Sequence, residues 1–187
     1  MNGRLKRIAM AGVAGLASIT VATAVAATKD KTFSSGTIST GVPDEGVAVR
    51  TLKVKTKGKI KDINASVSLT TTSNQDMTFL LRHPSGKTIH LSSGNGGSGN
   101  GYGTNGCGNP VTFDDEAADP VEDTEGVDTL FEGSYQPEQV DTNGNGGLSE
   151  LDGKKLNGKW QLVVVDTDEF AGGTLRCFKL EAKYKTA

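Results

Sequence analysis

The feature that most restricts the fold of this sequence is a two-residue alternation of apolar and polar side chains. The alternation recurs in short runs, at residues 50–55, 63–69, 77–81, 88–91, 160–165 and 174–184. Because successive side chains of a β-strand point to opposite faces, such runs predict strands with one buried face. Helical periodicity is almost absent after the first residues, so we expect an all-β chain.

Turn-forming residues separate these runs. His83 to Gly86 forms the tight-turn sequence His-Pro-Ser-Gly, and Gly58 separates the first two runs. Many short strands with regular turns predict a sandwich or barrel. The residues expected in its core are Trp160, Leu162, Val164, Phe79, Leu81, Val67 and Leu69. Residues 92–109 are nearly all Gly, Asn and Ser and are expected to form a flexible loop, whereas acidic residues 114–128 are expected to form a surface loop.

The N-terminal residues have the pattern of a secretory signal peptide. Three basic residues precede an uncharged stretch from Ile8 to Ala27 that ends in small residues. Cleavage after Ala26 is expected, with Ala24 as a second choice, and a membrane anchor is the alternative. We therefore expect a signal peptide at 1–26, a linker at 27–32 and one secreted domain at 33–187, with no membrane segment in the mature form.

Charge and cysteine content narrow the function classes. The signal peptide holds three of the 20 basic residues, so 17 remain against 22 acidic ones, a net charge of −5. This acidic balance argues against nucleic acid and anionic membranes as partners. Cys107 and Cys177 are the two cysteines, and an even number in a secreted chain predicts a disulfide, here closing a loop of about 70 residues. A metal site is the alternative, but no histidine neighbours either cysteine.

A set of motifs follows these strands in a fixed order. The early motifs are Gly58-x-Ile60-x-Asp62-Ile63-x-Ala65-x-Val67-x-Leu69, Asp76-Met77-x-Phe79-x-Leu81 and His83-Pro84-x-Gly86-Lys87. The later ones are Phe113-Asp114-Asp115-x-Ala117, Gly133-x-Tyr135-x-Pro137, Leu148-Ser149-x-Leu151-x-Gly153, Gly158-x-Trp160-x-Leu162-x-Val164-x-Asp166 and Gly173-x-Leu175. Over about residues 33 to 184, the set resembles the P/Homo B domain of the subtilisin-like proprotein convertase family.

This resemblance implies a jelly-roll-like antiparallel β-sandwich of the galactose-binding-like kind, with about eight strands. In the family, the module lies C-terminal to a serine endopeptidase domain that carries out proteolysis, and it packs against and stabilises that domain. Here we expect the module to stand alone. His83, Lys159 and Phe178 depart from the family, which commonly has Ser, Thr and Trp at these places.

Catalysis is not expected from these residues. Of the two histidines, His83 lies in a turn and His90 alternates outward from a strand, and no Gly-x-Ser-x-Gly elbow is present. We expect a module that binds or stabilises a subtilisin-like serine protease or another extracellular protein. The alternative is a calcium-dependent adhesion or carbohydrate-binding sandwich, for which Tyr102 is the one aromatic residue expected in an exposed loop. The identity of the partner and the oligomeric state stay open.

Two groups of oxygen-bearing side chains are candidate calcium ligands. The first has the spacing of an EF-hand loop, with its side-chain ligands at Asp141, Asn143, Asn145, Ser149 and Asp152. Because its last ligand is Asp rather than Glu, we expect weak affinity. The second group consists of acids at strand ends and in adjoining loops, namely Asp76, Asp114, Asp115, Asp166 and Asp168. Solvated turn caps are the alternative reading of these acids.

Overall fold

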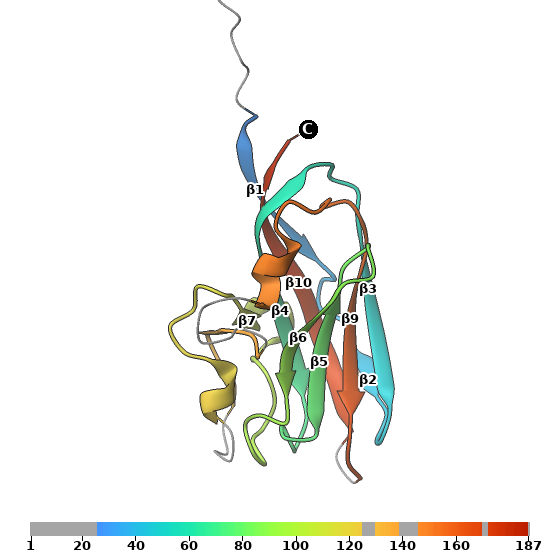
Figure 1. The fold of residues 1–187 in the computed structure, drawn as a ribbon. Coiled ribbons are helices and arrows are strands. Elements are labelled where there is room, and N and C mark those ends of the chain that lie inside the picture. The colour runs from blue at the N-terminus through green and yellow to red at the C-terminus, as the bar shows by residue number, and fades with distance from the viewer. Residues whose placement is uncertain (1–25, 125–129, 139–145, 170–171, 187) are drawn as a thin grey trace, which may run out of the picture.

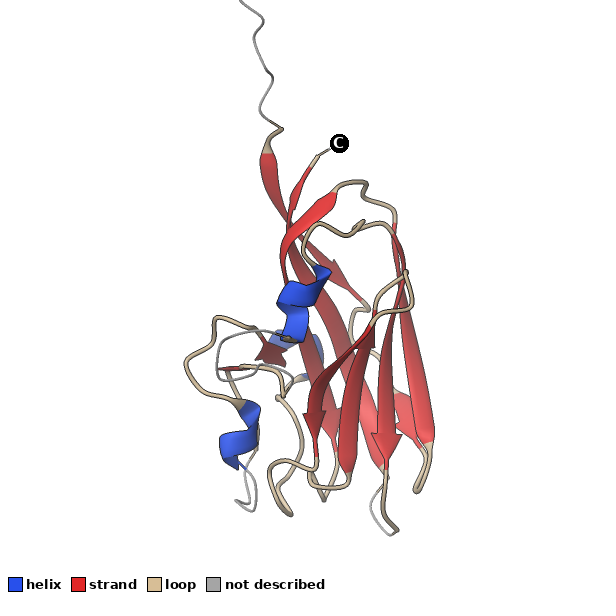
Figure 2. Ribbon diagram, in the orientation of Figure 1, coloured by secondary structure: helices blue, strands red, loops and turns tan. Residues whose placement is uncertain are grey.

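Two β-sheets face each other across the molecule, as a computed structural model shows (Figures 1 and 2). It describes residues 26–124, 130–138, 146–169 and 172–186. The expected signal peptide therefore lies outside the described residues, apart from Ala26. The all-β sandwich expected from the alternating runs is confirmed.

The first sheet has the strand order β1 (Thr28–Ser34), β10 (Gly173–Lys185), β4 (Lys59–Thr70), β7 (Val111–Phe113) and β8 (Ser134–Tyr135), and β2 (Thr40–Val42) also pairs with β10. The second has the order β3 (Val47–Val54), β9 (Gly158–Asp166), β5 (Met77–Arg82) and β6 (Thr88–Ser93). All these pairs are antiparallel except β7 with β8. Three short 3-10 helices complete the described elements: η1 (Gly106–Gly108), η2 (Val121–Thr124) and η3 (Gly147–Leu151).

The core fills the space between the two sheets. All seven residues expected there are buried, with Trp160 and Phe79 fully so. The central strand β9 is largely buried on both faces, as its doubly apolar sequence predicts. Burying Trp160 also buries its indole N–H, and that group donates a hydrogen bond to the Leu156 carbonyl at 2.8 Å.

Two expectations about the loops differ from the structure. Strand β1 pairs with β10 from Thr28 onward, so most of the segment expected as a linker belongs to the first sheet. Tyr102, expected in an exposed loop, is fully buried and stacks on Phe131 with ring centroids 4.5 Å apart. Its hydroxyl donates to the carbonyls of Asn74 and Asn95, both at 3.2 Å. The tyrosine thereby anchors the glycine-rich segment to the core, a long-range contact that local composition does not reveal.

Strand register places the connecting loops at two opposite ends. Pairing of Val54 with Gly158 brings loops 55–58, 83–87 and 152–157 to one end, here named the lysine end. Pairing of Met77 with Asp166 brings loops 43–46, 71–76 and 167–169 to the other, named the aspartate end. In Figure 1 the lysine end lies at the top, close to the C-terminus, and the aspartate end lies at the bottom.

Candidate functional site

Charge is divided between the two ends of the sandwich. The loops of the lysine end carry Lys55, Lys57, Lys87, Lys154 and Lys155 against one acid, Asp152. The loops of the aspartate end carry Asp44, Glu45, Asp76, Asp168 and Glu169, and β9 ends there at Asp166. No lysine or arginine occurs at 43–46, 71–76 or 167–169.

Asp166 is the most buried acid of the aspartate end, with 2% of its surface exposed. Its Oδ1 accepts a hydrogen bond from the Asp168 amide at 3.3 Å, but no described group donates to its Oδ2. Burial raises the pKa of Asp166, and the nearby charges of Asp44 and Asp76 add to the rise, against the main-chain amides of Asp168 and Glu45, which lower it. Asp76 is also buried, and its main-chain carbonyl accepts from the Thr167 amide at 2.9 Å. The carboxyls of this end are therefore crowded by like charge.

The structure separates the five acids of the second candidate group. Asp76, Asp166 and Asp168 lie together at the aspartate end, whereas Asp114 and Asp115 follow β7, and Asp115 contacts η3. Asp115 accepts from the Leu148 amide at 2.9 Å and from the Ser149 amide at 2.6 Å, so it caps the start of η3. Asp114 accepts from the Asn64 side chain and from the Glu116 amide, both at 2.9 Å. All four carboxylate oxygens of this pair are already hydrogen-bonded.

Of the EF-hand-like ligands, Asp141, Asn143 and Asn145 lie outside the described residues. Ser149 lies in η3, and its hydroxyl donates to the Gly146 carbonyl at 2.8 Å. Asp152 ends η3, where burial raises its pKa and the charges of Asp62 and Asp115 add to the rise.

Asp62 and Glu116, which the sequence did not single out as ligands, join the acids beside η3. A hydrogen bond to the Asp114 side chain raises the pKa of Glu116 to about 7. Burial and the Asp114 charge raise the pKa of Asp62. Nevertheless, no three carboxyl, cysteine or histidine side chains converge as a metal-binding group within the described ranges.

A serine and a histidine meet at the lysine end. The Nδ1 of His83 lies 2.8 Å from the Ser85 hydroxyl oxygen and also accepts from the Ser85 amide at 3.0 Å. The other ring nitrogen, Nε2, therefore carries the proton and donates to the Lys155 carbonyl at 3.0 Å. The ring packs edge-on against Trp160 at 4.7 Å between centroids. Burial lowers the pKa of His83 below its usual value and outweighs the hydrogen bond to the Lys155 carbonyl, which raises it, so the neutral imidazole predominates at pH 7.

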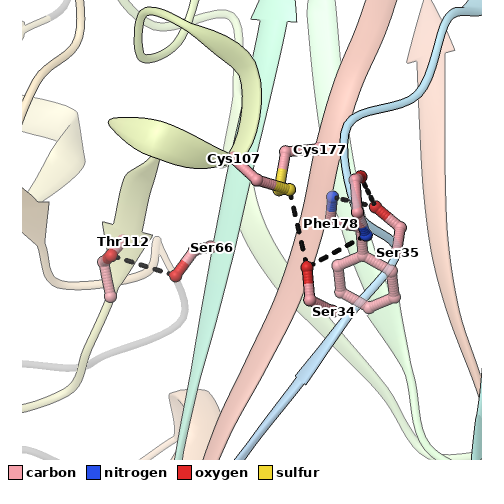
Figure 3. Close-up of a disulfide and its surroundings, with 8 residues drawn as sticks. Ser34, Ser35, Ser66, Cys107, Thr112, Cys177 and Phe178 are labelled. Carbon is pink, nitrogen blue, oxygen red and sulfur yellow. Dashed lines mark hydrogen bonds between the residues drawn. A yellow bond between two sulfur atoms is a disulfide. The ribbon is translucent and has the colours of Figure 1, made fainter.

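The expected disulfide between Cys107 and Cys177 is confirmed (Figure 3). It joins η1 to β10 with a Cα–Cα distance of 5.1 Å and closes a loop of 70 residues. The Ser34 hydroxyl contacts the Cys107 sulfur at 3.5 Å. The bond therefore ties the C-terminal part of the glycine-rich segment to the first sheet.

Comparison with known proteins informs the fold. No protein-family profile matches the chain, and no curated protein matches it at a significant level. Its fold is similar to crystal structures of a serine protease of Aeromonas sobria, one of the protease and one of its complex with a chaperone. In both comparisons the identity is 12% and the TM-score 0.52, over 86% of this chain and 28% of the solved chain. The chain thus spans less than a third of the solved chain's length.

No helix in the described parts of the chain is long and apolar enough to cross a membrane.

Proposed function

We propose that this chain is a secreted, non-catalytic P/Homo B module that binds or stabilises a serine protease of the subtilisin-like class or another extracellular protein. The observation that carries the proposal is that most of this chain has the fold of a module-sized part of a much longer serine protease chain. The ordered motifs from Gly58 to Leu175 support the same assignment. Binding a protein partner requires no reactive group, only a stable surface, which the disulfide-linked sandwich provides.

The contact between Ser85 and His83 fits a closed turn better than a nucleophile and its base. Catalysis would require Nδ1 to take the hydroxyl proton, yet this nitrogen already accepts from the Ser85 amide two residues along the chain. The ring is 4% exposed and packs against Trp160, so little of it is accessible to a substrate. In a hydrolytic triad, a carboxylate usually orients the histidine, but here a main-chain carbonyl accepts from Nε2.

Serine-directed labelling of the native complex tests this proposal. The protein would be immunopurified from the culture medium of its own producing cells and treated with a fluorescent fluorophosphonate. We expect the label on a co-purifying protease chain and none on this chain. Label on this chain that disappears in the Ser85→Ala variant would contradict the non-catalytic assignment. Purification without any bound protein partner would contradict the binding assignment.

We further propose that the aspartate end binds calcium. The observation that favours this site is the buried Oδ2 of Asp166, which has no hydrogen-bond donor and lies among like charges. Calcium takes carboxylate and main-chain oxygens, so Asp166 and Asp76 would hold it, with Asp168 and Asp44 nearby. Asp114 and Asp115 fit the ion poorly because their oxygens are occupied. The EF-hand-like loop starting at Asp141 is the competing site.

Calorimetric and thermal titration of the chelated protein with calcium distinguishes the two sites. An ion bound only by the folded state raises the thermal midpoint, and we expect a rise at about 5 mM calcium for an affinity typical of extracellular modules. The Asp166→Asn variant should lose the rise, whereas Asp141→Ala should keep it. The opposite pattern would assign the ion to the loop, and no rise in the unmodified protein would reject both sites.

The structure gives less support to the carbohydrate-binding alternative. Sugar-binding sandwiches commonly present exposed aromatic rings, but Tyr102 and Trp160 are both fully buried here. A glycan array should therefore show no binding.

A further inference from the structure

At the lysine end, Lys59, Lys155 and Lys185 form a row of like charges on neighbouring segments of the chain. Lys59 on β4 lies directly opposite Lys185 on β10 and, on its other side, opposite Lys155 in the loop before β9. Residues directly opposite each other in antiparallel pairs project to the same face of the sheet. In the second sheet, Lys53 lies opposite Lys159 at the same end. Like charges placed opposite each other destabilise a sheet, so each of these pairs costs the fold stability.

No described acid neutralises this row. The ion pair at this end joins Lys87 to Glu150, and none of the lysines of the row shares a salt bridge with a described residue. Lys59, Lys155 and Lys185 are exposed, and so is Lys57 in the adjoining turn. By contrast, Lys183 on β10 lies opposite Asp62, a pair of opposite charges. The row is therefore an exception to the charge pairing next to it.

A groove runs beside the row. Two adjoining hollows of about 400 and 320 Å³ share Lys155 and Asn157 in their walls. Pro84 and the edge of His83 line the first hollow, and Gly58 lines the second. Gly58 cannot be replaced by a larger residue without a clash, because a Cβ there would lie 2.6 Å from the Lys185 carbonyl oxygen. The groove thus combines an apolar wall with a cationic rim.

The segments that form the groove are held rigidly. The Ile60 amide donates to the Lys154 carbonyl at 2.9 Å, and the Leu156 amide donates to the Gly58 carbonyl at 3.0 Å. Trp160 and His83 fasten the same loop through the carbonyls of Leu156 and Lys155. The main chain that carries Lys59 and Lys155 is therefore held in place before any ligand arrives, so binding does not have to order these segments.

We propose that this groove docks an acidic, partly apolar segment of the protein partner. The inference rests on the proposed binding function and names the surface and the chemistry of the contact. Acidic side chains of the segment would face Lys59, Lys155 and Lys57 and neutralise the row, while apolar side chains would contact Pro84. A sulfated glycan would satisfy the charges but would gain little from the apolar wall. The observations therefore favour a peptide.

A labelled peptide tests the groove directly. The probe is a fluorescein-labelled peptide of four Asp-Leu-Glu repeats, with four Asn-Leu-Gln repeats as its uncharged control, and binding is measured by fluorescence anisotropy. We expect the acidic peptide to bind at 20 mM salt and at least tenfold more weakly at 200 mM, because the contact is electrostatic. Absence of binding, or equal binding of the uncharged peptide, would overturn the proposal.

Charge-reversal variants locate the binding surface. The K59E/K155E variant should weaken peptide binding at least tenfold. R176E/K179E changes the net charge equally on β10 but away from the row, and it should bind within twofold of the unmodified protein. An equal loss in both variants would show that the overall field, and not the groove, attracts the peptide. If K59E/K155E does not fold, the K59Q/K155Q variant removes the two charges with less disturbance and should also weaken binding.

Two other occupants of the groove give distinct results. If heparin binds more tightly than the peptide, and if K59E/K155E weakens the binding of both to the same extent, the groove is reassigned to a sulfated glycan. Self-association at low salt that K59E/K155E abolishes would reassign it to a second copy of the chain. A protease complex that K59E/K155E leaves unchanged would reject the groove but keep the proposed function. The absence of any protease or other protein complex would reject the proposed function itself.

Discussion

The two ends of the sandwich handle charge in opposite ways. At the aspartate end a carboxylate is buried, with one oxygen lacking a donor and two other acids nearby. At the lysine end the charged groups are mostly exposed, and the buried polar groups, the His83 ring and the Trp160 N–H, are hydrogen-bonded. Buried like charge is costly unless a cation neutralises it, whereas exposed like charge costs less and stays open to a binding partner. This contrast underlies the two proposals, a calcium ion at the aspartate end and an acidic protein segment at the lysine end.

The largest effect on the free energy of unfolding is expected from replacing Trp160, which supports the lysine end. Trp160→Ala should lower the free energy of unfolding by about 3 to 5 kcal/mol, because it removes a fully buried ring near the start of β9. It also removes the packing partner of His83. Urea denaturation followed by circular dichroism measures the loss, and Trp160→Phe is the matched control that keeps most of the volume. A loss below about 1 kcal/mol would contradict the role of the ring.

Removing the disulfide should have the next largest effect. Replacing Cys107 and Cys177 by alanine should cost about 2 to 5 kcal/mol, because the bond closes a 70-residue loop in the unfolded chain. We also expect faster hydrogen exchange in residues 103–109, which the bond ties to β10. Intact mass before and after reduction should differ by two hydrogens. Equal stability of the oxidised and reduced proteins would contradict this account.

Neutralising Asp166 at the aspartate end should change stability more than neutralising an exposed lysine at the lysine end. In chelator, Asp166→Asn should raise the free energy of unfolding by about 1 kcal/mol, because it removes a charge that burial and like charges disfavour. Lys155→Gln at the other end should change it by less than about 0.5 kcal/mol, as is usual for exposed residues. Thermal melts of the two variants side by side make the measurement. A large loss in Asp166→Asn would mean that the charge itself is required.

The smallest effect expected is a pH dependence of opposite sign at the two ends. The pKa of His83 is lowered in the folded protein, so the unfolded state binds its proton more readily, and stability from this residue is lost as the pH falls below 6.5. The pKa of Asp166 is raised, so folding disfavours its charge, and its contribution improves as the pH falls through the folded value.

The His83→Ser and Asp166→Asn variants separate these two contributions. Between pH 7 and 5, His83→Ser should lose less stability than the unmodified protein. As the pH falls further toward the usual carboxyl pKa of 3.8, Asp166→Asn should gain less stability than the unmodified protein. Urea denaturation at several pH values makes this measurement. Identical pH profiles for all three proteins would contradict both assignments.

Much of the fold could be predicted from the sequence, because burial in a strand leaves a local pattern. The alternation through Phe79 and Trp160 placed both residues in the core, and two cysteines in a chain with a signal-like N-terminus predicted the disulfide. Tyr102 was misplaced because the glycines around it are typical of loops. Its contacts with Phe131 and Asn74 involve residues that are distant in the sequence.

The candidate sites were harder to predict because they depend on strand register. Asp114 follows strand β7 and Asp166 ends strand β9, and nothing local shows that only Asp166 lies at the end with Asp76. Asp115 is an acidic residue in a loop, as many metal ligands are, yet its carboxylate accepts hydrogen bonds from amides at the start of η3. Likewise, Lys59, Lys155 and Lys185 form one row only after β10 and the loop before β9 pair with β4.

Crosslinking mass spectrometry of the native complex tests the central claim most directly, that this chain is a protein-binding module whose lysine end meets its partner. A zero-length carboxyl-to-amine crosslinker would be applied to the complex purified from culture medium. The account predicts crosslinks from Lys57, Lys59 and Lys155 to acidic residues of a serine protease or another protein chain. Crosslinks only from distant basic residues such as Lys179, or no bound protein at all, would contradict it.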